Sequence, residues 1–169
     1  MSSLKNLSLI IFGGILIGVG CAVFFHLVFS PGLIPPKVRF FDVWIPVVVL
    51  VFMIILIRAG KPERTFHFWE GLMAGNLMIW LGGLLSGLLI VVLESFDPLP
   101  FQHFLQSSVK YLQIADKEAP EGLKMPNLDK VLQEFRETKP SFMIWDEVKK
   151  KVLYSFILVP LVSLIFRRK

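Results

Sequence analysis

The chain has 169 residues, of which 54% are hydrophobic and only 18% are charged, and its formal net charge at pH 7 is +5. Together with a mean hydropathy of +0.67, this composition excludes a soluble domain with an ordinary charged surface and predicts a membrane protein. A spanning helix needs roughly 20 apolar residues to cross a hydrocarbon core about 30 Å thick, so the apolar runs define the expected fold.

Four apolar runs predict four transmembrane helices. They cover residues 7–29, 41–57, 68–93 and 152–166. The second and fourth runs are short, so flanking residues or a locally thin bilayer must supplement them. We therefore expect an all-α polytopic membrane protein with a single membrane domain, residues 1–169, and a helical extracytoplasmic insertion, residues 94–151, between the third and fourth helices.

The first run begins like a secretory or lipoprotein signal, because Lys5 precedes an apolar stretch that ends in Gly-Val-Gly-Cys at Cys21. Gly18, however, stands where a lipoprotein signal normally has leucine, and the apolar sequence continues past the cysteine. We interpret this run as an uncleaved spanning helix. A single cysteine allows no intrachain disulfide.

Small residues form one face on each of two predicted helices, and in lipid such faces let helix backbones approach closely. They are Gly14, Gly18 and Ala22 in the first run and Gly71, Gly75, Gly83 and Gly87 in the third. We expect these faces to pack the first and third helices together within one chain. A homodimer through the glycine faces is the alternative.

Two polar residues interrupt the third run. At a rise of 1.5 Å per residue, Glu70 lies about one turn inside the helix end, where we expect a capping role or an ion pair with Lys61 or Arg64 rather than a proton or cation site. Asn76 lies about 9 Å deeper. We expect its amide to bond a neighbouring helix as a structural contact.

Basic residues are distributed unequally between the two ends of the runs. By the positive-inside rule, one side is cytoplasmic and holds both termini. The basic residues on that side are Lys5, Arg58, Lys61, Arg64, Arg167, Arg168 and Lys169. Five basic residues oppose this orientation: Lys37, Arg39, Lys149, Lys150 and Lys151.

The insertion contains two predicted helices. Residues 101–113 show amphipathic spacing after a break at residues 97–100, where two prolines occur, and residues 127–137 form a shorter helix with Asn127 as its cap. A further helix is expected to run directly into the fourth span, which Pro160 should bend. The insertion is either a lid on the membrane surface or a docking surface for a partner.

No nucleophile motif, phosphate-binding loop or dinucleotide fingerprint occurs. His26, His67 and His103 are dispersed, and His67 with Glu70 supplies too few ligands for a metal. The sequence therefore predicts no catalytic, cofactor-binding or metal-binding residues and no cofactor. Its positive charge suits anionic lipid headgroups better than nucleic acid.

The third run opens as Phe-Trp-Glu-Gly at residues 68–71 and is followed by Asp97-Pro98. In these features, the four predicted spans and the long insertion before the last span, the chain resembles a family of small bacterial inner-membrane proteins catalogued only as a domain of unknown function. The resemblance covers nearly the whole chain. It implies a location in the bacterial inner membrane and no particular activity.

These observations favour a non-catalytic accessory or assembly subunit of a membrane complex, with the lipid bilayer and other membrane-protein subunits as its partners. The alternative is a protomer of an oligomeric transporter or channel, for which Glu70, Asn76 and Pro160 are the only candidate residues. A membrane enzyme would need a cluster of acids, bases or metal ligands, and we do not expect an enzyme.

Overall fold

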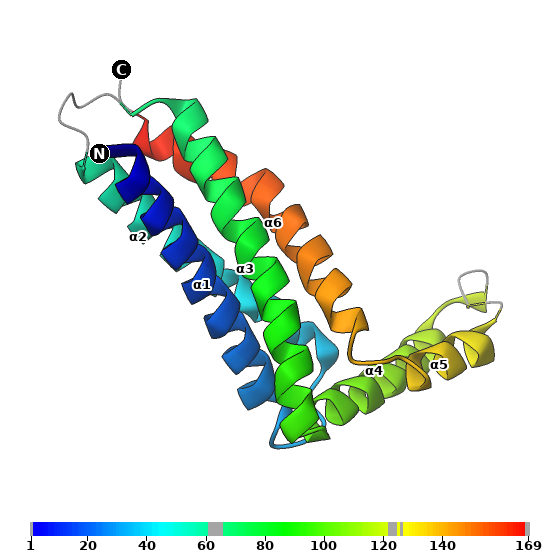
Figure 1. Cartoon of the computed structure of the whole chain (residues 1–169). Helices are drawn as coiled ribbons and strands as arrows, with labels where there is room; N and C mark the ends of the chain where they lie inside the picture. Colours follow the sequence, from blue (N-terminus) through cyan, green and yellow to red (C-terminus); the bar gives the residue numbers. More distant parts are fainter. Residues whose placement is uncertain (1, 61–65, 122–124, 126, 168–169) are drawn as a thin grey trace.

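The computed structural model describes residues 2–60, 66–121, 125 and 127–167, and every regular element in these ranges is helical (Figure 1). In chain order the elements are α1 (Ser2–Phe29), the 3₁₀ helix η1 (Pro36–Val43), α2 (Trp44–Ala59), α3 (Phe68–Phe96), α4 (Leu99–Glu118), α5 (Leu128–Arg136) and α6 (Phe142–Phe166). The predicted all-helical class is confirmed for these ranges.

Among the described residues, three segments are long and apolar enough to cross a membrane: Lys5–Phe29, Pro36–Ala59 and Phe68–Phe96. They match the first three predicted runs and identify a membrane-embedded protein. The helix that contains the fourth run, α6, is not among them. Its first three turns carry five charged residues, which leaves residues 152–166 as a short apolar stretch.

The helices α1, α2, α3 and α6 lie side by side in one bundle (Figure 1). The beginning of α1 and the end of α6 lie at the same end, which we call the proximal end. From the opposite, distal end, α4 and α5 project sideways from the bundle. The start of α1 and the end of α6 therefore lie at the proximal end of the bundle, and the insertion is attached at the distal end.

The glycine faces lie at two different helix contacts. An added Cβ at Gly14 or Gly18 would meet Leu81 or Leu85 of α3, at 2.7 and 2.8 Å. The α3 glycines differ from the expectation, because they face α6: a Cβ at Gly87 would lie 2.5 Å from the Ile144 Cα atom. The other three glycines of that stripe, Gly71, Gly75 and Gly83, meet Ser163, Val159 and Lys151. Since α3 lies between two helices, it turns separate faces to α1 and α6.

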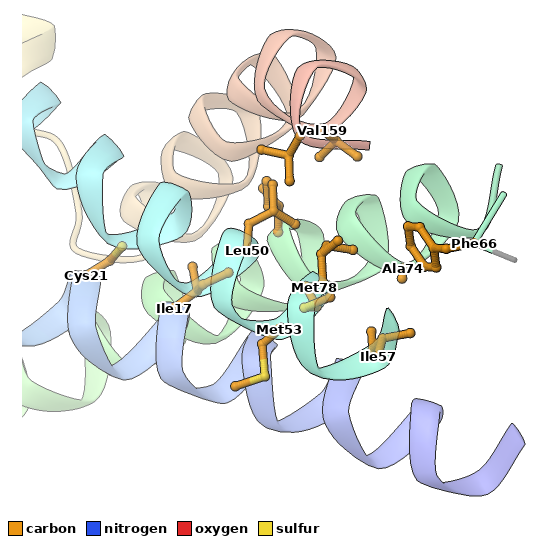
Figure 2. Packing of buried hydrophobic residues seen from close by; sticks show 12 residues of the cluster. Ile17, Cys21, Leu50, Met53, Ile57, Phe66, Ala74, Met78 and Val159 are labelled. Carbon is orange, nitrogen blue, oxygen red and sulfur yellow. The ribbon is translucent and has the colours of Figure 1, made fainter. Parts of the chain in front are cut away.

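Two apolar clusters fill the bundle. The proximal cluster joins α1, α2, α3 and α6 (Figure 2); it comprises Ile17, Cys21, Leu50, Met53, Ile54, Ile57, Phe66, Ala74, Met78, Ile79, Val159 and Val162. The distal cluster comprises Ala22, Phe25, Phe29, Ile90, Phe101, Phe104 and Met143. Its four phenylalanines are contributed by α1 and α4, so aromatic packing attaches the insertion to the bundle.

The insertion contains the helices that its pattern predicts, with different ends. The first amphipathic helix extends to Glu118, beyond its predicted end at residue 113. Asn127 occupies the N-cap position of α5 without a side-chain capping bond. The last helix begins at Phe142 and continues through Pro160 to Phe166.

Candidate functional site

The first turns of α6 carry charged side chains of both signs at helical spacing. Residues three and four apart are neighbours on a helix, so Glu147 lies beside both Lys150 and Lys151. The Lys150 Nζ atom is 2.6 Å from Glu147 Oε1, and the Lys151 Nζ atom is 3.4 Å from Glu147 Oε2. Glu147 is therefore paired along its own helix.

The 3₁₀ helix η1 supplies two further charges more than one hundred residues away in sequence. Its residues i and i+3 lie above one another, so Arg39 and Asp42 share a side. The Arg39 guanidinium is 2.5 Å from both Asp146 Oδ2 and Glu147 Oε1. Asp42 Oδ2 accepts hydrogen bonds from Lys150 at 2.8 Å and Lys151 at 2.6 Å. We call Arg39, Asp42, Asp146, Glu147, Lys150 and Lys151 the charged cluster.

Four of the six charged side chains of the cluster are buried, and Asp146 is a third exposed. Arg39, Asp42, Glu147 and Lys151 are 7%, 2%, 1% and 0% exposed. Burying a charge is costly unless it is paired and hydrogen-bonded, and here three cations face three carboxylates. The hydroxyl of Ser86 on α3 also donates to Glu147 Oε2 at 3.2 Å.

Glu147 lies near the centre of the cluster. Its two carboxylate oxygens are within ion-pair distance of three cations, Lys150, Lys151 and Arg39. This surrounding positive charge stabilises the ionised carboxylate.

Arg39 also links the charged cluster to the distal aromatic residues. Its guanidinium carbon lies 5.7 Å from the centroid of the Phe25 ring and 5.2 Å from that of Phe104, within cation–π range. One side chain of η1 therefore contacts α1, α4 and α6. This position makes Arg39 the link between the first connection, the bundle and the insertion.

An open cavity of about 720 Å³ lies beside the charged cluster, between η1, α4, α5 and α6. We call it the distal groove. Its charged lining residues are Lys37, Arg39, Glu134, Asp146, Lys149 and Lys150. Exposed apolar side chains, among them Phe40, Phe142 and Leu153, complete its walls. The groove combines positive charge with apolar surface.

The two predicted intramembrane polar residues lie away from this site. The Glu70 carboxylate accepts a hydrogen bond from the backbone N–H of His67 at 3.0 Å, which is a capping contact in the first turn of α3. The expected partners Lys61 and Arg64 lie outside the described residues. Glu70 precedes Ser86 by 16 residues, or about 24 Å along the helix.

Within the part of the chain that the structure describes, Asn76 bonds its own helix and not the expected partner on a neighbouring helix. Its side-chain nitrogen donates to the backbone carbonyl of Leu72 at 2.8 Å. A carbonyl four residues earlier is within reach of a short polar side chain in a helix, so α3 itself satisfies this amide donor.

Two of the histidines join segments that are distant in the sequence. His26 Nε2 lies 3.5 Å from Asp97 Oδ2, and His103 Nδ1 lies 2.8 Å from the backbone oxygen of Phe29. Both contacts connect the distal end of α1 to the beginning of the insertion. His67 precedes the first turn of α3.

The charged cluster was not predicted from the sequence. Arg39 and the lysines of α6 were counted only as separate charges that opposed the orientation. A signal was present, because acidic and basic residues lie three or four apart in both η1 and α6. The sequence pattern does not show that η1 and α6 pair with each other.

One comparison with known proteins gives a match. The family model for "Protein of unknown function (DUF4199)" matches residues 11–168. No curated protein and no solved structure matches the chain.

Proposed function

The chain belongs to the DUF4199 family of proteins of unknown function, and we propose that it is a non-catalytic accessory or assembly subunit of a membrane complex. The observation that carries this proposal is the pairing within the charged cluster. Each of its three cations contacts at least two carboxylate oxygens, all from within the chain. Groups paired in this way fix segments relative to one another, which is the task of a scaffold.

The positions of the other polar residues support this role over that of a transporter or channel protomer. A solute path through a membrane is ordinarily lined by polar groups or broken helices. Glu70 makes a capping contact, Asn76 bonds its own helix, and α6 continues through Pro160. These are contacts within single helices, which favours the accessory role.

We further propose that α6 is the fourth span and that both termini are cytoplasmic, with the protein in the bacterial inner membrane. α6 packs closely along α3 over much of its length. The positive-inside rule counts basic residues, and the seven on the side of the termini outnumber the five on the opposite side, which supports the orientation.

In this arrangement the insertion is extracytoplasmic and offers a surface for a partner subunit. A hollow of about 630 Å³ is lined by α4 and by Arg136 of α5, and no member of the charged cluster lines it. It is lined mainly by long polar side chains: Gln102, Gln106, Lys110, Gln113 and Arg136. We propose that a partner binds this surface through hydrogen bonds.

Purification from the native membrane tests the proposal. A tagged full-length chain, extracted in mild detergent, should bring down the same other chains in stoichiometric amount, and tagging one of those chains should recover this protein in return. The triple variant Gln102→Ala, Gln106→Ala, Lys110→Ala should lose them. A matched control on the outer side of α5 and the end of α4, Lys117→Ala, Asp129→Ala, Lys130→Ala, should retain them.

The opposite result has a definite meaning. If the chain is recovered only with itself, as a dimer or larger ring, the accessory role is wrong and the transporter role gains support.

A further inference from the structure

The distal groove has unused hydrogen-bond donors as well as positive charge. Four cations and two carboxylates line it. Lys37 and Lys149 are exposed, and within the described ranges neither has an ion-pair partner. Arg39 Nε and the Tyr154 hydroxyl are buried and have no hydrogen-bond partner among the described residues. Ammonium, guanidinium and phenol donors together suit an anion with several oxygens, such as a phosphate.

The surface next to the groove is apolar and faces outward. Leu153 lines the groove and is 63% exposed, and it begins a stripe along α6 at spacings of three and four. The stripe continues with Phe156, Ile157, Leu161 and Leu164, all exposed by half or more. From Leu153 to Leu164 it is about 16 Å long at 1.5 Å per residue. That length is close to half of a hydrocarbon core about 30 Å thick, which is one leaflet.

We propose that the distal groove binds an anionic phospholipid of the surrounding bilayer, with its phosphate headgroup at Lys37, Lys149, Arg39 and Tyr154 and one acyl chain along the α6 stripe. The charge of the headgroup complements Lys37 and Lys149, the lining cations that lie outside the charged cluster. The acyl chain accounts for the apolar stripe that begins at the groove. A soluble anion would make the first contact and not the second.

The exposed residues Phe40 and Phe142 fit the same occupant. They are 60% and 47% exposed and lie on η1 and at the start of α6, on the rim of the groove. Apolar rings beside charged groups suit the interfacial region of a bilayer, where amphipathic surfaces bind membranes. Along α6, Phe142 precedes Lys149 by seven residues and Leu153 follows it by four, so charge and aliphatic surface succeed one another as headgroup and tail do in a phospholipid.

Native mass spectrometry of the purified full-length chain tests the site. The protein in neutral detergent is titrated with palmitoyl-oleoyl phosphatidylglycerol and, separately, with the zwitterionic palmitoyl-oleoyl phosphatidylcholine. One phosphatidylglycerol should bind at least tenfold more tightly than phosphatidylcholine. Each basic residue near a membrane surface contributes about fivefold to anionic lipid binding, so Lys37→Gln with Lys149→Gln should weaken binding about 25-fold.

A matched control keeps the overall charge change the same. The variant Lys117→Gln with Lys130→Gln alters two exposed lysines of α4 and α5 outside the groove, and it should bind phosphatidylglycerol like the natural chain. Since all four lysines are exposed, circular dichroism should show unchanged helix content in both variants. Equal weakening in both variants, or equal affinity for the two lipids, overturns the proposal.

Two competitors separate a lipid from a free anion. Inorganic phosphate should not displace phosphatidylglycerol at concentrations equal to that of the lipid, and dihexanoyl phosphatidylglycerol should bind at least tenfold more weakly than the long-chain lipid. Full displacement by phosphate overturns the assignment of a lipid. Because the purified chain alone is used, this result is independent of whether a partner subunit exists.

Discussion

The proximal and distal halves of the bundle are held together by different forces. In the proximal half, apolar side chains such as Leu50, Met78 and Val159 fill the space between four helices. In the distal half, ion pairs connect η1 to α6, and the phenylalanines of the distal cluster pack beside them. Apolar contacts tolerate many alternative arrangements in lipid, whereas charges that are buried require specific partners.

The difference shows where this chain specifies its register. Sliding α6 along α3 by one turn would exchange some apolar contacts for others in the proximal half. In the distal half it would separate Glu147 from Arg39 and Ser86. The charged cluster is therefore the part that fixes one arrangement, and the proximal half follows from it.

The largest expected effect comes from removing the centre of the charged cluster. Glu147→Ala leaves Arg39, Lys150 and Lys151 with one carboxylate fewer, and breaking a buried ion pair in this way costs about 3–5 kcal/mol. The free energy of unfolding, measured by dodecyl sulfate titration in mixed micelles, should fall by that amount. Glu118→Gln, at the exposed end of α4, should change it by less than about 0.5 kcal/mol.

A second variant distinguishes charge from packing at the same place. Glu147→Gln with Lys151→Met restores charge balance at nearly the same volume, so it should lose less stability than Glu147→Ala. An equal or larger loss would mean that the cluster acts through shape and not through charge.

The next effect tests the contact between α3 and α6. In Gly87→Ala the new Cβ would lie 2.5 Å from the Ile144 Cα atom and 3.1 Å from the Met143 carbonyl oxygen. A backbone atom cannot shift without moving the helix that contains it. We therefore expect the free energy of unfolding to fall by about 3 kcal/mol, the upper end of the usual range for overpacking. The same titration applies. Gly60→Ala, whose Cβ would be 3.7 Å from its nearest neighbours, is the control and should be nearly neutral.

A smaller effect is expected in the proximal half. Leu50→Ala removes a side chain that is fully buried in the proximal cluster. We expect the free energy of unfolding to fall by about 2 kcal/mol, the low end for a Leu→Ala change, because the unfolded helices remain in an apolar medium. A loss larger than that of Glu147→Ala in the same titration would reverse the comparison between the two halves.

The smallest effect is expected at Asn76. Because its amide bonds a carbonyl of its own helix, Asn76→Leu removes no contact between helices, and stability should change by less than about 0.5 kcal/mol. Co-purification with partner chains should also persist. A loss of more than 1 kcal/mol would indicate that Asn76 does contribute a contact between helices.

The sequence predicts the local structure of this chain well and its long-range pairing poorly. The apolar runs predict α1, α2 and α3, and amphipathic spacing predicts α4 and α5, because these signals depend on neighbours three and four residues apart. Gly14 and Gly87 were both expected at helix contacts, but α3 has more than one small-residue face and the pattern does not say which helix each face meets.

The charged cluster illustrates the same limit. The spacing of Glu147 and Lys151 along α6 is visible in the sequence, yet their pairing with Arg39 and Asp42 depends on the first connection reaching α6 in space. Separations of 108 and 109 residues exceed the range of any local pattern. The orientation rule treated these residues as free charges because it contains no information on partners.

The long separation between η1 and α6 has a consequence for biogenesis. Arg39 and Asp42 are synthesised early, and their partners on α6 are made about one hundred residues later. While the ribosome completes the insertion, the first connection holds two charges whose partners do not yet exist. A chain that stops before α6 keeps these two charges without their partners. Packing of α6 against η1 is therefore the step that completes the charged cluster.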